Sequence, residues 1–321
     1  MSPFRLTRLL PEGTAGADLR ADVLHGLTRT PKVLPPKWFY DARGSELFEE
    51  ITRLPEYYPT RAERSILAVR ATDVAAATGA RTLVELGSGS SEKTRHLLRA
   101  LGPGLDSYVP VDVSESALKG AGAALGAQMP ALRVHALVAD FTRGLVLPDT
   151  PGPRLVAFLG GTLGNLLPDE RAVFLRSVRG LLAPGDALLL GTDLVKDEGV
   201  LVAAYDDAAG VTAAFNKNVL SVLARELGAD ADPDCFDHVA LWDRENEWIE
   251  MRLRAREALT VKIPELDLAV SFAAGEELRT EVSAKFRQAG VAAELAGAGL
   301  ELRHWWTDGK GWFALSLSTA V

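Results

Sequence analysis

The chain has 321 residues, 47% of them hydrophobic, and a formal net charge of −8 at pH 7. This length and apolar content are sufficient for one large domain or two of ordinary size, so a disordered chain is excluded. The negative charge and the lack of a basic cluster argue against a nucleic-acid partner and favour a small substrate.

The single cysteine, Cys235, excludes an intramolecular disulfide bond and a cysteine-rich metal site. No apolar run approaches the length of a membrane span, and charged residues and a proline interrupt the beginning of the chain. We therefore expect a cytoplasmic protein that has no membrane contact and acts as a monomer.

The first sixty residues predict two helices joined by an aromatic-rich connector. A short amphipathic helix is expected over 16–29, three prolines follow within 30–37, and a second helix is expected over 46–52. Six large aromatic side chains lie between residues 38 and 58. Composition alone favours a packed N-terminal core, and a wall or lid over a pocket is the alternative.

From residue 61 onward, helices and strands alternate. Helices are expected over 61–78, 91–101, 114–126 and 168–182, and strands over 82–86, 107–112, 132–139, 154–159 and 186–193. Such alternation predicts an α/β fold with a parallel sheet.

A glycine-containing turn follows the first of these strands, in the stretch Glu85-Leu-Gly87-Ser-Gly89. The glycines permit a tight bend and a close approach of a ligand to the backbone. A dinucleotide site would have a third glycine where Glu92 stands, and a P-loop would have glycine immediately before Lys93-Thr94, so NAD and ATP are disfavoured. The stretch resembles motif I of the class I methyltransferases, which bind S-adenosylmethionine, although a tight turn in another α/β protein is the alternative.

Acidic residues follow the next two strands. Asp112 ends the strand over 107–112 and is suited to hold two ribose hydroxyls. Asp140-Phe141 follows the third strand and offers an acceptor for the adenine amino group beside a flat apolar ring. Each acid alone could be a helix cap. Three such features at successive strand ends predict a cofactor site, because ligands bind at the carboxyl edge of parallel sheets.

Residues 196–286 interrupt the alternation with a helical stretch over 198–227, an acidic loop over 229–237 and strand-like runs over 247–258 and 260–272. A helix is expected over 280–298, and two runs over 300–306 and 312–317 predict a terminal hairpin. This pattern matches the Rossmann-like methyltransferase sheet of seven strands with the last one antiparallel. We expect a methyltransferase domain of residues 62–195 and 287–321, and a substrate-binding domain of residues 1–61 and 196–286.

Five longer motifs resemble the actinobacterial histidine Nα-methyltransferases of ergothioneine biosynthesis. They are Leu34–Asp41, Ile51–Arg61, Gly160–Asn165, Gly191–Asp197 and Tyr205–Asn216, and the resemblance covers nearly the whole chain. Gly161 departs from the serine expected in the family. The resemblance implies an enzyme that trimethylates L-histidine to hercynine with S-adenosylmethionine.

The resemblance also implies the residues of the site. Cofactor contacts fall on Gly87, Ser88, Gly89, Lys93, Asp112, Val113, Asp140 and Phe141. Substrate contacts fall on Tyr57, Asn165, Tyr205, Glu281, Val282 and Ser283. We also expect Gly160 and Met251 in the substrate site, together with the rings of Tyr40 and Phe215, which are candidates for cation–π contacts with the methylated amine. Among these, Tyr57 and Asn165 are expected to orient the amine for catalysis.

The chemistry of these residues fits such a transfer. Because S-adenosylmethionine already carries an activated methyl group, the main demand is the positioning of a neutral amine. The five histidines are scattered, so no metal is expected. Taken alone, Glu281 is better explained as the acidic first turn of a helix. The resemblance instead assigns to Glu281 and Ser283 the task of accepting from and donating to the two imidazole nitrogens. A methyltransferase for tryptophan or tyrosine, and a catalytically silent module that binds S-adenosylmethionine, are the alternative functions.

Overall fold

The structure is a computed structural model that describes residues 4–11 and 13–321. The chain divides into two compact units. Unit 1 consists of Met1–Pro11, Pro59–Val195 and Phe286–Val321, and unit 2 consists of Glu12–Tyr58 and Lys196–Lys285. Residues 4–11 therefore lie in unit 1, whereas the sequence analysis assigned residues 1–61 to the second domain. Within the described residues, no helix is both long and apolar enough to cross a membrane.

Unit 1 is built on one sheet with the strand order β1-β5-β4-β3-β6-β7-β14-β13. The strands from β1 to β7 in this order run parallel, and β14 runs antiparallel to both of its neighbours. Their bounds are β1 Phe4–Arg8, β3 Thr82–Leu86, β4 Ser107–Asp112, β5 Arg133–Val138, β6 Arg154–Phe158, β7 Ala187–Asp193, β13 Leu300–Thr307 and β14 Phe313–Ala320. The strand order reverses between β3 and β6, which is where open α/β sheets bind their ligands.

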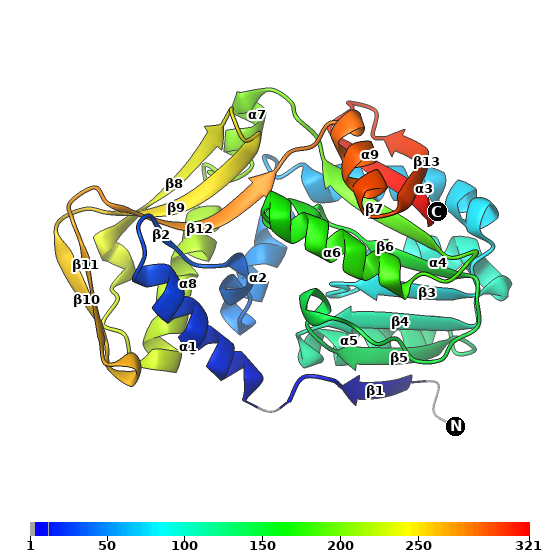
Figure 1. Ribbon diagram of the computed structural model, residues 1–321, viewed down its shortest axis with the longest axis horizontal. Coiled ribbons are helices and arrows are strands. Elements are labelled where there is room, and N and C mark those ends of the chain that lie inside the picture. The colour runs from blue at the N-terminus through cyan, green and yellow to red at the C-terminus, as the bar shows by residue number, and fades with distance from the viewer. Residues whose placement is uncertain (1–3, 12) are drawn as a thin grey trace. The chain divides into compact units, whose positions relative to one another are not determined.

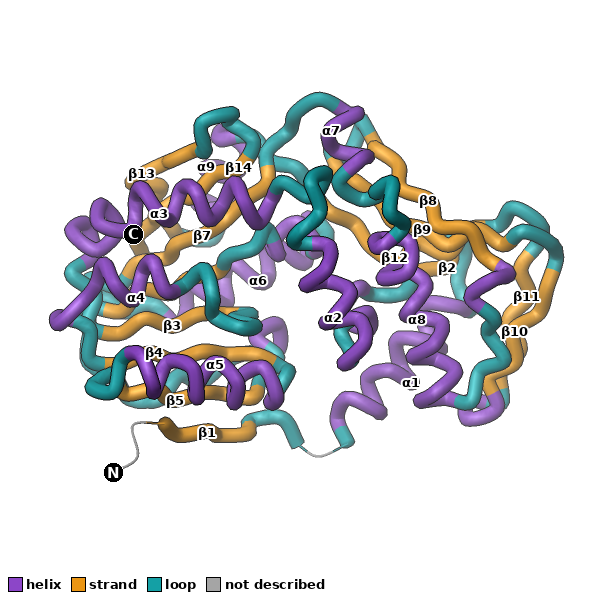
Figure 2. Tube along the Cα trace, turned by 180° about the vertical axis from the view of Figure 1, so that it is seen from behind, coloured by secondary structure: helices purple, strands orange, loops and turns teal. Residues whose placement is uncertain are grey.

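Helices cover both faces of this sheet. On one face lie α3 (Pro59–Thr78), α4 (Arg95–Leu101) and α5 (Glu115–Gln128), and on the other lie α6 (Pro168–Leu181) and α9 (Gln288–Gly297) (Figures 1 and 2). Because both faces are covered, the central strands β3 and β7 are buried along their whole length and are mostly apolar. The main core includes Val74, Leu83, Leu97, Leu189 and Phe313, each fully buried.

The α/β class of the fold is confirmed, but two details of unit 1 differ from the sequence prediction. Over the described residues the sheet has eight strands and not seven, because the short strand β1 pairs with β5 at the sheet edge. The helix expected from residue 91 begins only at Arg95. Ser91 has a φ of 54°, and this left-handed conformation cannot be part of an α-helix.

Unit 2 contains a second sheet with the order β2-β12-β9-β8 and a separate hairpin of β10 and β11. Helix α8 packs against β8, β9 and α2. The bounds are α1 Thr14–Leu27, β2 Lys32–Val33, α2 Ala42–Ile51, α7 Glu198–Ala203, α8 Val211–Leu227, β8 Phe236–Asp243, β9 Trp248–Ala255, β10 Leu259–Ile263, β11 Leu268–Phe272 and β12 Glu277–Ala284.

The long helical stretch expected over 198–227 is divided into α7 and α8. Gly210 precedes α8 with a φ of 72°. The Asp207 carboxylate accepts hydrogen bonds from the backbone N–H groups of Val211 and Thr212 at 3.0 and 2.7 Å. These contacts satisfy the first orphan donors of α8 and end the preceding segment.

The prediction of a helix over 280–298 is wrong in its first part. Residues 277–284 form strand β12, which pairs antiparallel with β9, and α9 starts only at Gln288. Leu278, Thr280 and Val282 of this strand are buried. Backbone hydrogen bonds to β9 hold this segment as a strand, and a local sequence pattern contains no information about that distant partner.

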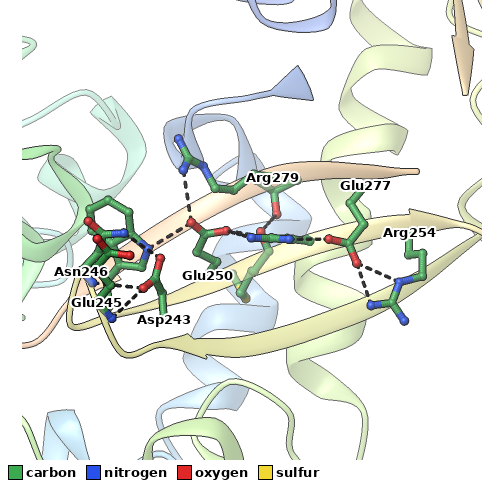
Figure 3. A network of polar contacts seen from close by, with 11 residues as sticks. Asp243, Glu245, Asn246, Glu250, Arg254, Glu277 and Arg279 are labelled. Carbon is green, nitrogen blue, oxygen red and sulfur yellow. Dashed lines mark hydrogen bonds and ion pairs between the residues drawn. The ribbon is translucent and has the colours of Figure 1, made fainter. Parts of the chain in front are cut away.

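One face of this sheet carries a network of ion pairs, shown in Figure 3. Arg254 donates to Glu277 at 2.8 Å across the β9–β12 pair, and Arg279 donates to Glu250 at 3.2 Å. Arg252 lies between them and bonds to both acids. The network shows that Glu250, Arg252, Arg254, Glu277 and Arg279 share one face of the sheet, named here the ion-pair face.

Candidate functional site

The glycine turn after β3 has the geometry that a close ligand approach requires. Gly87 and Gly89 have φ values of 68° and 49°, which L-residues with a side chain rarely adopt. A Cβ at Gly89 would meet nothing within 4 Å, so the space before the turn is open. The backbone N–H groups of Gly87 and Ser88 donate to the carbonyl of Val111 at 2.8 and 3.2 Å, which ties the turn to β4.

Asp112 at the end of β4 is held beside this turn. Its carboxylate accepts from the backbone N–H of Gly89 at 2.9 Å and from that of Ser114 at 2.8 Å. Burial raises the pKa of Asp112, and these backbone hydrogen bonds oppose the rise. The contact brings Gly87, Gly89 and Asp112 together at one edge of the sheet. The neighbouring Val113 side chain is exposed.

Asp140 and Phe141 play different parts after β5. The Asp140 carboxylate accepts from the N–H and hydroxyl of Thr142 at 2.9 and 2.6 Å, so it caps the short 3-10 helix Phe141–Arg143. The Phe141 ring lies against the glycine turn, because a Cβ at Gly87 would come within 3.4 Å of it. Phe141 therefore presents a flat apolar surface beside Gly87.

Lys93 contacts a residue that the sequence analysis missed. Its ammonium forms an ion pair with Glu63 of α3, whose side chain is fully buried. The other oxygen of the Glu63 carboxylate accepts from the backbone N–H of Gly160 at 2.7 Å. Glu63 thus joins the turn after β3 to the loop after β6. Its only sequence signal was an acid inside an otherwise apolar helix face.

The acid of the glycine motif, Glu85, is also buried. Its two carboxylate oxygens accept from the hydroxyls of Thr94 and Tyr108. Burial raises the pKa of Glu85 to about 7, and the two hydroxyls and the Lys93 ammonium act in the opposite direction. Glu85 therefore stabilises the glycine turn through buried hydrogen bonds and does not face the open space before it.

Asn165 ends the 3-10 helix Thr162–Asn165, which follows β6 in unit 1. Gly160 and Gly161, with φ values of 85° and 71°, turn the chain toward this short helix. The Asn165 side chain is partly exposed. Gly160 and Asn165 thus belong to unit 1, while the other predicted substrate residues belong to unit 2.

In unit 2 a β-bulge decides where Glu281 points. The register of β12 against β9 shifts between Arg279 and Glu281, so Thr280 is the extra residue. Glu281 then pairs with Met251. Because side chains alternate along a strand, Met251 points away from the ion-pair face, and its cross-strand partner Glu281 does the same. Without the bulge, the side chain of Glu281 would point to the ion-pair face, as that of Arg279 does.

Ser283 follows Glu281 by two positions and shares its face, opposite to the ion-pair face. Val282 lies on the ion-pair face, since it pairs with Glu250. The side chain of Val282 is therefore not placed together with those of Glu281 and Ser283. Removal from water raises the pKa of Glu281 to about 7, and the nearby Lys285 ammonium acts in the opposite direction.

Tyr205, Ser283 and Lys285 form a closed triangle of hydrogen bonds. The Tyr205 hydroxyl and Ser283 Oγ lie 2.7 Å apart, and the Lys285 ammonium donates to them at 2.9 and 2.8 Å. Each of the three residues is buried. Lys285 is a second residue that the sequence analysis missed. Nothing in the sequence around it distinguishes it from an exposed lysine at the end of a strand.

The backbone of Tyr205 is held by a buried histidine. His238 Nε2 lies 2.8 Å from the Tyr205 carbonyl, and Asn216 Nδ2 lies 2.8 Å from His238 Nδ1. Since a carbonyl only accepts, His238 carries its proton on Nε2. Burial lowers the pKa of His238. Since His238 pairs with Leu253, which shares the face of Met251, this neutral histidine lies on the same face of the sheet as Glu281.

The predicted aromatic residues of unit 2 form one connected series. The ring of Phe48 lies 5.5 Å from Tyr40, 5.9 Å from Phe215 and 6.1 Å from Tyr57, and Tyr57 lies 6.5 Å from Tyr205. Phe215 is buried, whereas the side chain of Tyr40 is 44% exposed. The series thus combines a packed core, as composition favoured, with rings that reach the surface.

The residues of unit 1 fit a cofactor with an adenosine and an amino-acid part. Ser88 Oγ is buried and, within the described residues, has no hydrogen-bond partner. An orphaned hydroxyl inside an open glycine turn is expected where a polar ligand completes the contacts. Asp112 supplies an acceptor, Phe141 a flat ring and Lys93 a cation. No group of three or more metal-ligating side chains occurs in the described part of the chain.

The strand order of unit 1 and the acidic-x-Gly-x-Gly turn beside its switch point define a class I methyltransferase that uses S-adenosylmethionine. The family described as "Histidine-specific methyltransferase, SAM-dependent" matches residues 19–320. The chain belongs to this family.

Named relatives agree with this assignment. A histidine N-alpha-methyltransferase of Mycolicibacterium smegmatis is 58% identical over 315 residues, which cover 98% of both chains. A protein of the same name from Mycobacterium tuberculosis is 55% identical over 96% of this chain and 97% of its own. Ergothioneine biosynthesis protein 1 of Neurospora crassa is 35% identical over 63% of this chain and 24% of its own.

Proposed function

We propose that this protein is an L-histidine Nα-methyltransferase that transfers three methyl groups from S-adenosylmethionine to the α-amino group and forms hercynine, in the first step of ergothioneine biosynthesis. The observation that carries this conclusion is the match to a histidine-specific family over residues 19–320. The near full-length identity to two histidine N-alpha-methyltransferases supports it. The partial identity to an ergothioneine biosynthesis protein supports the place in the pathway.

The residues of unit 1 hold the cofactor. S-adenosylmethionine, when bound, supplies a methyl group already activated by its sulfonium. Asp112 accepts hydrogen bonds from the ribose hydroxyls, and Phe141 stacks beside the adenine. Lys93, held by Glu63, neutralises the carboxylate of the methionine part. The turn over Gly87, Ser88 and Gly89 lets the backbone approach, while Asp140 and Val113 border the adenosine.

The residues of unit 2 hold histidine. Glu281 accepts from one imidazole nitrogen, and Ser283 donates to the other. Their shared face on β12 supports this assignment. Tyr205 borders the amino acid, and Met251 packs against the ring. Val282 contributes through its backbone, because its side chain is on the ion-pair face.

The remaining residues act on the amine. Tyr57 and Asn165 orient it through hydrogen bonds, and Gly160 leaves room for it. Tyr40 and Phe215 add aromatic rings, which attract the cationic products. Each transfer needs a neutral nitrogen with its lone pair free, so a proton leaves the amine before each step. Mono- and dimethylhistidine are accordingly substrates as well. The enzyme acts as a cytoplasmic monomer without a metal, a nucleic acid or a membrane partner.

Mass spectrometry of the products from a panel of free amino acids tests this function. The purified protein is incubated with S-adenosylmethionine and each of histidine, tryptophan, tyrosine, phenylalanine and leucine. We expect mono-, di- and trimethylhistidine in sequence, with little product from the others. Preferred methylation of tryptophan or tyrosine would indicate a different amino-acid substrate. Cofactor binding without any methylated product would indicate a catalytically silent module.

A further inference from the structure

Lys285 lies at the centre of the buried hydrogen-bond triangle with Tyr205 and Ser283. Lys285 is only 3% exposed. An ammonium has three donors and no acceptor, so both contacts of Lys285 in the triangle are donations. The hydroxyls of Tyr205 and Ser283 must therefore each use one lone pair on Lys285.

The third side of the triangle fixes the Ser283 hydroxyl. Tyr205 and Ser283 share one hydrogen bond of 2.7 Å, in which either could donate. Both oxygens already accept from Lys285, and the phenolic O–H is the more acidic of the two, so Tyr205 donates to Ser283. Ser283 Oγ then accepts twice, from Lys285 and from Tyr205, and both of its lone pairs are occupied. Only its own O–H remains for a ligand.

We propose that Lys285 is a positioning residue that makes Ser283 a donor only, so that the site selects a ring with an unprotonated acceptor nitrogen. This inference rests on the proposed function. Glu281, two positions before Ser283 on the same face of β12, accepts from the ring N–H. A donor and an acceptor side by side match neutral imidazole, which has one N–H and one bare nitrogen. They mismatch imidazolium, which has two N–H groups, and a ring without an acceptor.

Lys285 also disfavours a cationic ring through its charge. An ammonium buried beside the ring repels a second cation in surroundings where water screens the repulsion poorly. This repulsion opposes the attraction that the Glu281 carboxylate exerts on a cationic ring, whereas the direction of the Ser283 hydrogen bond disfavours such a ring by itself. An imidazole that has lost its acceptor would leave the Ser283 hydroxyl without a partner, which weakens binding more than the loss of a solvent-exposed bond.

Two analogues test this direction of the hydrogen bond. In pyrrol-2-ylalanine and pyrrol-3-ylalanine, one or the other imidazole nitrogen is replaced by C–H, so each ring keeps an N–H and lacks an acceptor. Binding of histidine and both analogues is measured by calorimetry at pH 8 with S-adenosylhomocysteine present. We expect the wild-type protein to bind histidine about tenfold more tightly than the better analogue, a ratio that corresponds to about 1.4 kcal/mol.

A double-mutant cycle tests the part played by Lys285. In Lys285→Met the preference for histidine should fall to about threefold or less, because Ser283 regains a free lone pair. In a Ser283→Ala background, Lys285→Met should leave the preference unchanged, which a general structural role would not predict. Lys262→Met, at an exposed lysine of β10, is the matched control and should retain the wild-type ratio. Affinity for S-adenosylhomocysteine alone reports whether each variant is folded.

The outcomes separate this inference from the proposed function. If Lys285→Met kept the full wild-type preference for histidine, the proposed role of Lys285 would be wrong. It would also be wrong if Lys285→Met reduced the preference equally in the wild-type and Ser283→Ala backgrounds. Equal affinities of the wild-type protein for histidine and an analogue would overturn the inference even if Lys285→Met did not fold. Absence of methylated histidine in the product assay would instead overturn the proposed function.

Discussion

The carboxyl group of Glu281 offers a test that separates the stability of the protein from substrate binding. Glu281→Gln keeps the shape of the side chain and removes its titration. We expect the variant to be more stable than the wild-type protein at pH 8 and yet to bind histidine less tightly. The reason is that the site keeps a carboxyl group where water hydrates it poorly.

The sign of the stability change follows from the pKa. Removal from water raises the pKa of Glu281 from its ordinary value of 4.5 to about 7. The folded protein therefore holds this proton more tightly than the unfolded chain. The resulting stability is fully present below pH 4.5 and is lost as the pH rises through about 7. The glutamine variant does not titrate at this position, so its stability does not fall for this reason over the same pH range.

The magnitude follows from the same two values. The gap between 4.5 and about 7 corresponds to at most about 3 kcal/mol. Because the Glu281 side chain is partly exposed, solvent screening reduces this to about 1–2 kcal/mol. At pH 5.5, about one unit above 4.5, less than half of the full difference should have developed. Histidine binding should weaken roughly ten- to a hundredfold, since a hydrogen bond to a charged acceptor contributes about 1.5–3 kcal/mol.

Thermal unfolding at pH 5.5 and pH 8 measures the stability change, and calorimetry with S-adenosylhomocysteine present measures histidine binding. Comparing the proteins at each pH cancels the titration of Glu85, which has a pKa in the same range.

Glu277→Gln is the matched control, on the same strand but on the ion-pair face (Figure 3). Burial raises the pKa of Glu277, but hydrogen bonds from Arg252 and Arg254 outweigh it and lower the pKa overall. The stability that the Glu277 carboxylate contributes is complete above pH 4.5 and is lost only as the pH falls through its lowered pKa. Glu277→Gln should therefore be destabilised equally at pH 5.5 and pH 8.

Two results would refute the reasoning about Glu281. If Glu281→Gln were less stable than the wild-type protein at pH 8 by as much as at pH 5.5, the carboxylate would not be poorly hydrated. If the variant bound histidine as tightly as the wild-type protein, imidazole recognition would have to be assigned to other residues.

Three further predictions concern the cofactor and the chemical steps. Asp112→Ala should weaken the affinity for S-adenosylhomocysteine at least tenfold in calorimetry, because the ribose hydroxyls lose a charged acceptor and Gly89 loses its anchor; an unchanged affinity would place the ribose elsewhere. Glu63→Gln should lower the affinity for S-adenosylhomocysteine several-fold but leave that for methylthioadenosine unchanged, because Glu63 holds Lys93 and methylthioadenosine has no amino-acid part; equal losses for both ligands would assign Glu63 a general structural role. Tyr57→Phe should bind histidine and slow the three methyl transfers to different extents in single-turnover time courses, and wild-type rates in all three would exclude the Tyr57 hydroxyl from orienting the amine.

The sequence by itself determined the cofactor-binding half of the protein. Largely apolar runs such as 82–86 and 107–112 predict buried parallel strands, because a sheet covered on both faces needs apolar side chains on both sides of each strand. The glycines at 87 and 89 and the acid at 112 are local signals, since a positive φ and a strand end are properties of neighbouring residues. These signals, with the family motifs, were sufficient to predict the fold class, the cofactor and the methyltransferase family.

Only the tertiary structure decided how the polar side chains meet. Glu63 and Lys93 are 30 positions apart, and Tyr205 and Lys285 are 80 positions apart. Local propensity contains no information about such pairs, because packing and strand register bring them together. The acidic start over 280–283 favoured a helix, but pairing with β9 made it a strand. The bulge at Thr280, which turns Glu281 toward the face of Ser283, exists only because two strands far apart in the chain pair in that register.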